Sequence, residues 1–266
     1  MREDYWKIVE FGKMPKLNKP VFIEGLPGIG NVGKVAVDFL IDELKAKKLY
    51  EITSYTFPHS VFVNEDNLVE LPVVEVFYRQ FNGKKDILLL GGDVQPIDEV
   101  SSYEFSDKIL DLVQKFGGRE VITLGGIGLV DIPKKPKVYC TGNSKKIIDR
   151  YKSELVSNNL YGVVGPIVGV SGLLLGLASR RNIEAISLLA ETYGHPMYLG
   201  IKGAKEILKV LNKKLELNLD ISRLDREIKD IESQIMKKTE QLAQVTKSIA
   251  MKKLQKKFGR DVDYIG

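Results

Sequence analysis

Glycines gather at positions where a chain could hold a nucleotide or a phosphate. The segment 28–33, Gly-Ile-Gly-Asn-Val-Gly, fits the dinucleotide fingerprint G-x-G-x-x-G between an expected strand at 21–23 and an expected helix at 32–47. With Lys34 it also fits G-x-x-x-x-G-K, but Val35 stands where a P-loop needs Ser or Thr for magnesium. A dinucleotide site also needs an acid at the end of the second strand, and the β-rich stretch 50–57 carries Glu51 only at its start.

Glycines of this kind also serve packing, because they allow sharp turns and a close approach of helix to sheet. We therefore interpret two loops as structural, with nucleotide binding as the alternative. Their glycines are Gly28, Gly30, Gly33, Gly125, Gly126 and Gly128.

Carboxylates and one serine occur near the expected strand ends, where α/β sheets bind ligands. The acids are Asp93, Asp98, Asp131 and Glu191, and the sequence alone does not bring them together. Ser171 lies in Gly-Val-Ser-Gly-Leu, which resembles a nucleophile elbow except that Leu173 replaces the final glycine. We predict no catalytic residue.

Histidine and cysteine are too few for a zinc pattern. His59 and His195 each neighbour a proline and are expected in turns, and Cys140 is the single cysteine. Tyr193 and Tyr198 either line a pocket or fill the core. We expect no metal and no cofactor, and we predict that the protein is not an enzyme.

The composition of the 266 residues, 44% apolar, fits a globular protein with a sizeable core. A single cysteine, an N-terminus without an apolar signal core and a glycine-broken apolar stretch at 163–178 predict a cytoplasmic protein without membrane association. The net charge is +5, but the C-terminal bases lack interleaved aromatics, which disfavours nucleic acid as a partner.

Apolar runs of strand length alternate with helical patterns along most of the chain. This predicts an α/β fold with a mixed, mostly parallel sheet flanked by helices. An antiparallel insertion at 50–78 includes a hairpin with a four-residue turn at 64–67. We place a globular domain at 1–217, a charged helix with a heptad pattern at 218–258 and a tail at 259–266.

The C-terminal helix is predicted by apolar residues at alternating steps of three and four, with one interruption at Lys238. This seam consists of Ile221, Leu224, Ile228, Ile231, Ile235, Leu242, Val245 and Ile249. Residues 216–235 hold six acids and three bases, and residues 236–260 hold eight bases and one acid. That asymmetry suits the helix dipole, or it matches an acidic surface on a partner.

The chain ends in a short tail with apolar and aromatic residues after Phe258. We expect partner binding by this tail. Its candidate residues are Val262, Tyr264, Ile265 and Gly266.

Four motifs, taken in order, resemble the archaeal members of the proteasome assembly chaperone family over about residues 15–250. They are the glycine loop at 25–33, Leu-Gly-Gly-Ile-Gly at 124–128, Gly-Pro-Ile-Val-Gly-Val-Ser-Gly at 165–172 and Glu-Thr-Tyr-Gly-His-Pro at 191–196.

The resemblance implies a fold like that of purine nucleoside phosphorylases, homo-oligomers and a role in proteasome handling. Family members either assist assembly of the 20S core or dock on its α-ring as activators. Docking uses a C-terminal motif of a hydrophobic residue, a tyrosine and any residue, whose terminal carboxylate meets a lysine between α subunits. Here Tyr264 is third from the end and follows Asp263, so the tail is shifted from that pattern.

We therefore expect a homo-oligomeric proteasome assembly chaperone or activator-like adaptor that binds 20S α subunits through its C-terminal segment. A tetramer and a pentamer are both compatible with the sequence. The alternative is a nucleoside- or nucleotide-binding protein, or an enzyme, that uses the glycine-rich loops.

Overall fold

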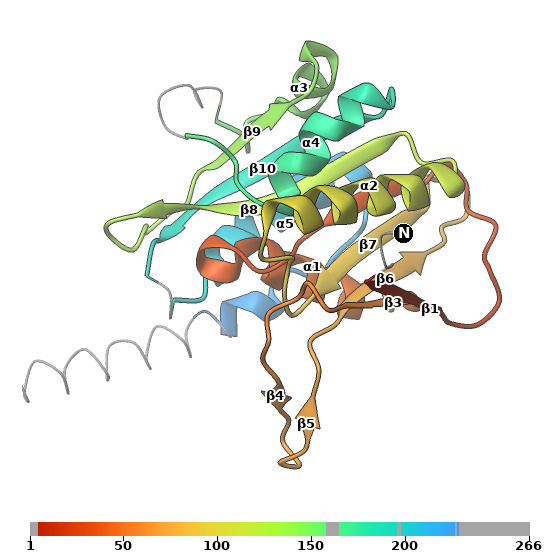
Figure 1. Cartoon of the computed structure of the whole chain (residues 1–266). Helices are drawn as coiled ribbons and strands as arrows, with labels where there is room; N and C mark the ends of the chain where they lie inside the picture. The colour runs from red at the N-terminus through yellow and green to blue at the C-terminus, as the bar shows by residue number, and fades with distance from the viewer. Residues whose placement is uncertain (1–4, 158–164, 196–197, 227, 229–266) are drawn as a thin grey trace, which may run out of the picture. The chain divides into compact units, whose positions relative to one another are not determined.

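A computed structural model describes residues 5–157, 165–195, 198–226 and 228 of the chain (Figure 1). The chain divides into two compact units, Met1–Ile221 and Ser222–Gly266. All elements named below belong to the first unit.

The first unit is built on an eight-stranded mixed sheet with the order β1-β3-β6-β7-β2-β8-β10-β9. Its four central strands, β7, β2, β8 and β10, run parallel, and the outer strands on both sides are antiparallel to their neighbours. The strands are β1 (Trp6–Glu10), β2 (Val21–Glu24), β3 (Lys47–Ser54), β6 (Val74–Arg79), β7 (Ile87–Gly92), β8 (Glu120–Leu129), β9 (Val138–Gly142) and β10 (Glu184–Tyr193).

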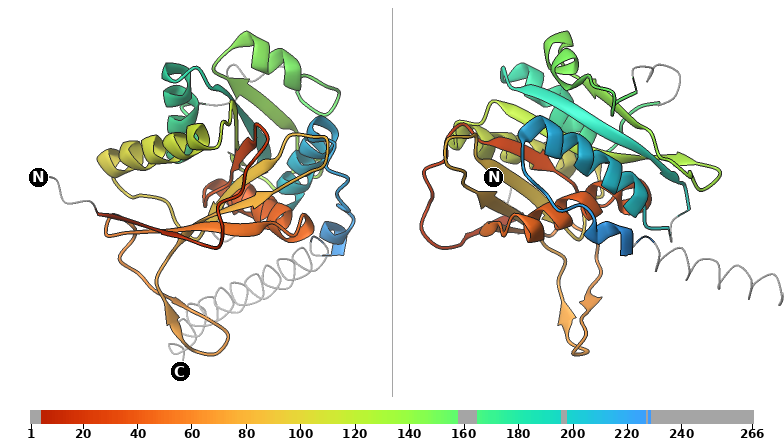
Figure 2. Two further views of the ribbon diagram at one scale, coloured as in Figure 1. Left: turned by 90° about the vertical axis from the view of Figure 1, so that its right-hand side faces the viewer. Right: turned by 180° about the vertical axis from the view of Figure 1, so that it is seen from behind.

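Helices cover both faces of this sheet (Figures 1 and 2). Helices α1 and α5 pack together on one face and α2 and α4 on the other, while α3 packs beside β9. Their bounds are α1 (Val32–Glu43), α2 (Glu99–Lys115), α3 (Lys145–Tyr151), α4 (Val170–Arg180) and α5 (Ile201–Leu215), with a short 3-10 turn η1 (Ile29–Asn31) before α1. The mixed α/β architecture predicted from the sequence is confirmed.

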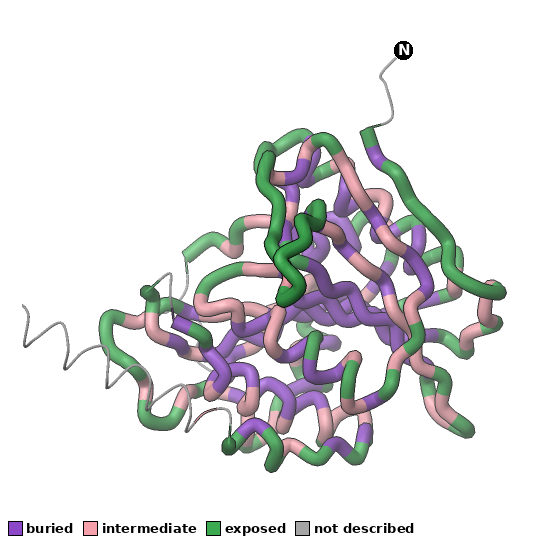
Figure 3. The backbone as a smooth tube through the Cα atoms, turned by 90° about the horizontal axis from the view of Figure 1, so that it is seen from below, coloured by how far each residue is buried: buried purple, intermediate pink, exposed green. Residues whose placement is uncertain are grey.

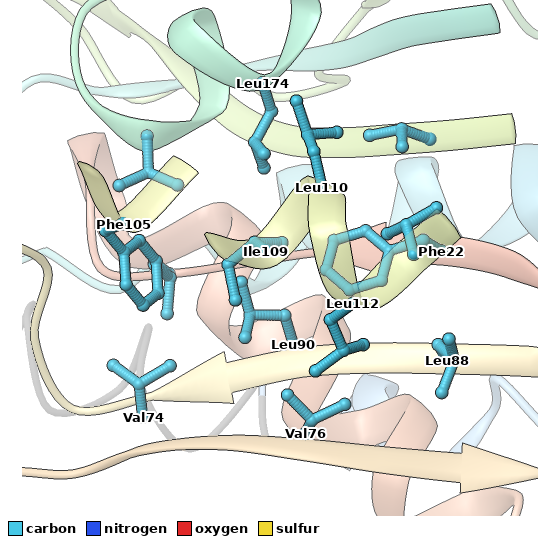
Figure 4. Close-up of a cluster of buried hydrophobic side chains, with 14 of the residues drawn as sticks. Phe22, Val74, Val76, Leu88, Leu90, Phe105, Ile109, Leu110, Leu112 and Leu174 are labelled. Carbon is cyan, nitrogen blue, oxygen red and sulfur yellow. The ribbon is translucent and has the colours of Figure 1, made fainter. Parts of the chain in front are cut away.

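The central strands are apolar on both faces because helices bury both. Every residue of β2 and of β7 is buried. Between the sheet and α2 and α4, Phe22, Leu88 and Leu90 pack with Phe105 and Ile109 (Figure 4). In Figure 3 the buried residues lie mainly in the interior of the first unit, and the exposed residues surround them. Burial of one such side chain stabilises the fold by about 1.5–3 kcal/mol.

Polar side chains fix where two helices begin. Asp98 precedes α2 and accepts a hydrogen bond from the Ser101 amide at 2.9 Å. Ser144 precedes α3 and accepts one from the Ile147 amide at 3.4 Å. Both satisfy amides that a helix N-terminus leaves without partners.

Two element boundaries differ from those expected. Helix α1 ends at Glu43 and β3 already begins at Lys47, with Lys45 between them at a φ of 50°. Strand β8 does not end at Leu124 but continues through its glycines to Leu129, because β10 extends beside it in register to Tyr193. The N-terminal residues were expected to form an extended arm or an edge, and residues 6–10 form the edge strand β1.

The expected hairpin between β3 and β6 is confirmed and projects from the sheet (Figure 1). It pairs β4 (Phe62–Val63) with β5 (Val69–Glu70). Its turn is held by the Asn64 side chain, whose oxygen accepts hydrogen bonds from the amides of Asp66 and Leu68.

Across the described residues, every helix is too short or too polar to cross a bilayer.

Candidate functional site at the glycine-rich edge of the sheet

The carboxyl ends of the parallel strands β2 and β8 lie side by side, at the point where the connections after them go to opposite sides of the sheet. After β2 the chain crosses to the side that holds β7, β6 and β3, and after β8 it crosses to the side that holds β10 and β9. In open α/β sheets the crevice at such a switch point is the usual ligand position.

A cavity of about 320 Å³ occupies this crevice. Its walls come from the loop after β2, the end of β8 and the segment before α4, and they are mostly apolar or backbone. The residues are Leu26, Pro27, Gly28, Ile29, Gly33, Gln95, Leu124, Gly125, Gly126, Ile127, Gly128, Gly165, Pro166, Ile167, Val168, Ser171 and Leu189.

Two of the loop glycines are required by close packing. A Cβ atom on Gly33 would collide with the carbonyl oxygen of Leu124, and one on Gly126 would collide with that of Ile29. Helix α1 and the loop before it therefore lie directly on the backbone of β8. Gly28 differs, because a Cβ there would meet nothing within 4 Å.

The remaining glycines pack against side chains or neighbouring backbone. Gly30 has a φ of 60°, and an added Cβ would meet the Thr192 hydroxyl at 2.7 Å. A Cβ on Gly125 would meet Leu189 at 3.0 Å, and one on Gly128 would meet Gly194 at 3.3 Å. At these three positions an added Cβ would thus come close to β10 or to the residue that follows it.

The polar centre beside the cavity is Glu24, a fully buried carboxyl at the end of β2. The Ser171 hydroxyl donates to its Oε2 at 2.8 Å, and the Leu26 amide donates to its Oε1 at 3.0 Å. Burial raises the pKa of Glu24 to about 7, although both hydrogen bonds act in the opposite direction. The carboxyl can therefore gain or lose a proton near neutral pH.

Gln95 joins the loop after β2 to the start of α4. Its amide nitrogen donates to the Pro27 carbonyl, and its oxygen accepts from the Val170 amide at 3.2 Å. The Glu24–Ser171 pair makes a second link between β2 and α4. These two links hold opposite walls of the cavity at a fixed spacing.

The sequence-based search missed Glu24. It treated Ser171 only as a possible nucleophile, and the structure gives the serine a different partner, a buried carboxylate from 147 positions earlier. A glutamate directly after Val-Phe-Ile, in a strand buried on both faces, was the available signal.

The candidate acids do not converge on the cavity. Asp93 lies 3.7 Å from the Lys34 ammonium, and Asp98 caps α2. Glu191 accepts hydrogen bonds from the Tyr139 hydroxyl and the Lys137 amide. Asp131 lies in the exposed loop after β8. Each of the first three thus has a local structural partner.

The histidines and the cysteine also lie apart from the cavity walls. The His195 ring stacks on Tyr193 at 5.7 Å, and Tyr198 packs edge-on against the same tyrosine at 5.6 Å and is buried. His59 lies near the base of the hairpin.

Burial raises the pKa of the Cys140 thiol, which disfavours the reactive thiolate. The described parts of the chain contain no cluster of three or more His, Cys, Asp or Glu suited to a metal ion.

The predicted tail and most of the seam lie outside the described residues. This applies to Val262, Tyr264, Ile265 and Gly266, and in the seam to Ile231, Ile235, Leu242, Val245 and Ile249. Of the seam, the structure describes Ile221, Leu224 and Ile228.

The protein has a three-layer α/β fold with a mostly apolar cavity at the switch point of its sheet. In the described part of the chain, no set of catalytic side chains comes together at this cavity. The family is shown by comparison with known proteins. The chain belongs to the PAC2 family, whose model matches residues 22–239.

Two solved structures of archaeal proteins resemble this chain in both sequence and fold. The Pyrococcus furiosus protein PbaB, described as an archaeal proteasome activator, is 38% identical with a TM-score of 0.80, over 89% of this chain and 99% of that one. PbaA of the same organism, described as an archaeal homolog of proteasome-assembly chaperone, is 26% identical with a TM-score of 0.72, over 96% and 99%. The resemblance drawn from the four motifs is therefore confirmed.

A curated relative extends the similarity to a second archaeon. An uncharacterized protein of Methanocaldococcus jannaschii is 32% identical over 221 residues, which cover 83% of each chain.

Proposed function

We propose that this protein is a homo-oligomeric adaptor of the archaeal 20S proteasome, acting as an assembly chaperone or an activator. The similarity to PbaB, which extends over 89% of the chain at 38% identity, carries the proposal. The proposal includes a cytoplasmic location and no catalytic role.

The C-terminal segment is the proposed contact with the α subunits. Its seam of apolar residues from Ile221 to Ile249 would pair helices, within the protomer or between copies, and the residues at 259–266 would form the tail. Several tails in one oligomer raise the effective concentration at a target with several subunits, so each tail contact can be weak. Val262, Tyr264, Ile265 and Gly266 would make that contact in a shifted register.

Removal of residues 261–266 tests the proposal directly. We expect the truncated protein to keep its oligomeric mass and to lose co-sedimentation with 20S particles or free α subunits. Tyr264→Ala should reproduce most of the loss, whereas Asp261→Ala should bind like the unmodified chain. Unchanged binding of the truncated protein would remove the tail from the mechanism.

A second candidate function is supported by the cavity at the switch point. The Ser171 hydroxyl and the backbone of the glycine-rich loops line this cavity and could recognise a small polar ligand such as a nucleoside. Thermal-shift measurements with nucleosides, nucleotides and phosphate would detect it.

A cavity-filling variant makes that test specific. Gly28→Leu would add a side chain at a cavity-lining position where a Cβ meets nothing within 4 Å, whereas Gly30→Val would collide with Thr192 and disturb the fold. A concentration-dependent shift that Gly28→Leu abolishes would favour ligand binding, and the absence of any shift would leave the cavity a packing feature.

A further inference from the structure

A second pocket lies at the opposite end of the parallel strands from the switch-point cavity. It has a volume of about 240 Å³ and is lined by the first residues of β2, β7 and β8, which are Val21, Ile87 and Glu120. Helices α3 and α5 contribute Arg150 and Lys214 from their last turns. The pocket is therefore distinct from the glycine-rich site, which lies at the other ends of β2 and β8.

Positive charge exceeds negative charge in this pocket. Its lining contains four bases and two acids, which are Lys84, Lys85, Arg150 and Lys214, and Glu120 and Glu216. The difference is two positive charges, and we call this site the basic pocket. A concave surface lined mainly by one sign of charge attracts ions of the other sign.

Acids just outside the lining have partners of their own. Glu184 pairs with Lys146 at 3.0 Å as well as with Arg150. The carboxylate of the buried Asp86 accepts hydrogen bonds from two main-chain amides, at 2.7 and 2.8 Å. Neither acid lines the basic pocket, so its four bases and two acids set the charge that a ligand meets there.

A buried carboxylate holds two of the four bases in place. Glu120 is only 5% exposed, and its Oε1 accepts a hydrogen bond from the Tyr151 hydroxyl at 2.7 Å. Its Oε2 accepts from the Lys85 ammonium at 3.0 Å and from the Arg150 guanidinium at 2.9 Å. A buried carboxylate requires such partners, so this contact fixes both bases at the pocket. The side chains of Lys85 and Arg150 are 55% and 37% exposed, so both can also reach a ligand.

The other two bases are held by main-chain carbonyl oxygens. Lys214 donates to the carbonyls of Arg150 and Lys152 at 2.8 and 2.9 Å. Lys84 donates to the carbonyl of Glu216 at 2.9 Å. A carbonyl oxygen positions an ammonium group without cancelling its charge. Because an ammonium has three N–H donors, Lys214 keeps one and Lys84 keeps two in the described structure.

We propose that the basic pocket binds the phosphate group of inorganic phosphate or of a small phosphomonoester. A phosphate group carries about −1.5 to −2 charges at pH 7 and three acceptor oxygens, which match the excess charge and the N–H donors of the lining. Arginine and lysine are the side chains that bind phosphate groups. The volume is smaller than the roughly 300–1,000 Å³ of sites for drug-sized ligands, which favours a small anion over a complete nucleotide. This site is independent of the proposed function.

Equilibrium dialysis of the full chain against radiolabelled inorganic phosphate tests the proposal. At near-neutral pH and physiological salt, where charges more than about 8 Å apart are screened, we expect saturable binding of one phosphate per chain. Lys214→Gln should weaken binding at least about tenfold, because a charge-assisted donor is lost.

Lys213→Gln is the matched control for this variant. Lys213 is the preceding base of α5, pairs with Glu154 and lies outside the lining, so its replacement should leave the affinity unchanged. Equal weakening in the two lysine variants, or no saturable binding by the unmodified chain, would overturn the proposal.

Glu216→Gln gives a prediction that misfolding cannot mimic. The Glu216 carboxylate is 77% exposed and lies 3.7 Å from the Lys84 ammonium. Its replacement removes a negative charge from the lining but keeps the main-chain carbonyl that holds Lys84. We therefore expect phosphate to bind about two- to fivefold more tightly, the size of a surface charge interaction. Unchanged or weaker binding would contradict the charge argument.

Competition distinguishes the two sources of the phosphate group. Displacement of the label by both inorganic phosphate and glycerol phosphate would show that the site accepts phosphomonoesters, and displacement by inorganic phosphate alone would restrict it to the free anion. Equal displacement by chloride at the same ionic strength would overturn the site. Gly28→Leu, in the switch-point cavity, should leave phosphate binding unchanged, and a loss of binding in that variant would assign the phosphate to the cavity instead.

Discussion

The Ser171 hydroxyl, at the start of α4, donates a 2.8 Å hydrogen bond to the carboxylate of Glu24, at the end of β2. Ser171 lines the cavity, and Glu24 is completely buried behind it. This pair links the central strand to a helix on one face of the sheet at the edge where α/β proteins bind ligands.

Glu24 makes the stability of the protein depend on pH. Its pKa is raised from 4.5 to about 7 by burial, so between these values the unfolded chain releases a proton that the folded chain retains. The free energy of unfolding should therefore fall as the pH rises from 4.5 to 7, by roughly 3 kcal/mol at about 1.4 kcal/mol per pKa unit. Urea unfolding across this range should show a flatter profile for Glu24→Gln than for the unmodified chain. Glu65→Gln, at the exposed hairpin tip, is the control.

Ser171→Ala should move this transition to higher pH. The serine hydrogen bond lowers the Glu24 pKa, so its removal lets burial raise that pKa further. At pH 8 the variant should also lose about 1–3 kcal/mol of stability, because a buried carboxylate oxygen loses its donor. Ser171→Cys, which retains a weak donor of similar shape, should lie between the two. A transition at the same pH in Ser171→Ala would show that the pair does not control Glu24.

Gly126→Ala should destabilise the fold, whereas Gly28→Ala should leave its stability unchanged. The methyl group on residue 126 would meet the Ile29 carbonyl and force the loop away from β8, at a cost of about 1–3 kcal/mol. The methyl group on residue 28 would meet nothing within 4 Å, so that variant should unfold at the temperature of the unmodified chain. Thermal unfolding of both variants checks the comparison, and equal melting temperatures would contradict the packing explanation.

Tyr151→Phe should destabilise the protein more than Tyr139→Phe. The Tyr151 hydroxyl donates to Glu120 at 2.7 Å, and that carboxyl is only 5% exposed. The Tyr139 hydroxyl donates to Glu191, which is less buried and also accepts from the Lys137 amide. We expect about 1–3 kcal/mol for the first change and less for the second, measured by urea unfolding. A larger loss for Tyr139→Phe would contradict the burial argument.

Local patterns predicted most of the fold. The apolar runs at β2 and β7, the periodicity of α2 and α4 and the turn residues of the hairpin each correspond to an observed element. Element ends were predicted less well, because the partner strand decides them. Gly125 and Gly126 indicate a loop by composition, yet Leu189 and Ala190 pair with them and keep β8 extended.

The site could be predicted only in part, for a related reason. The glycine loops were visible as a pattern, but the polar pair joins residues that are distant in sequence, and neither Glu24 nor Ser171 fits a known catalytic motif. One face of the hairpin carries Val63 and Val69, which pair with each other, and it depends on register, since a shift of one residue would place Leu68 rather than Val69 on it. A contact between strand and helix determined the polar pair, and strand pairing determined the hairpin face; composition reveals neither.

The hairpin arises between β3 and β6, two adjacent antiparallel strands that pair with each other from Lys47–Tyr78 to Ile52–Val74. That pairing is complete without the segment between them. A change in the length or charge of this arm therefore leaves the sheet, and the cavity at the far end of β2 and β8, intact.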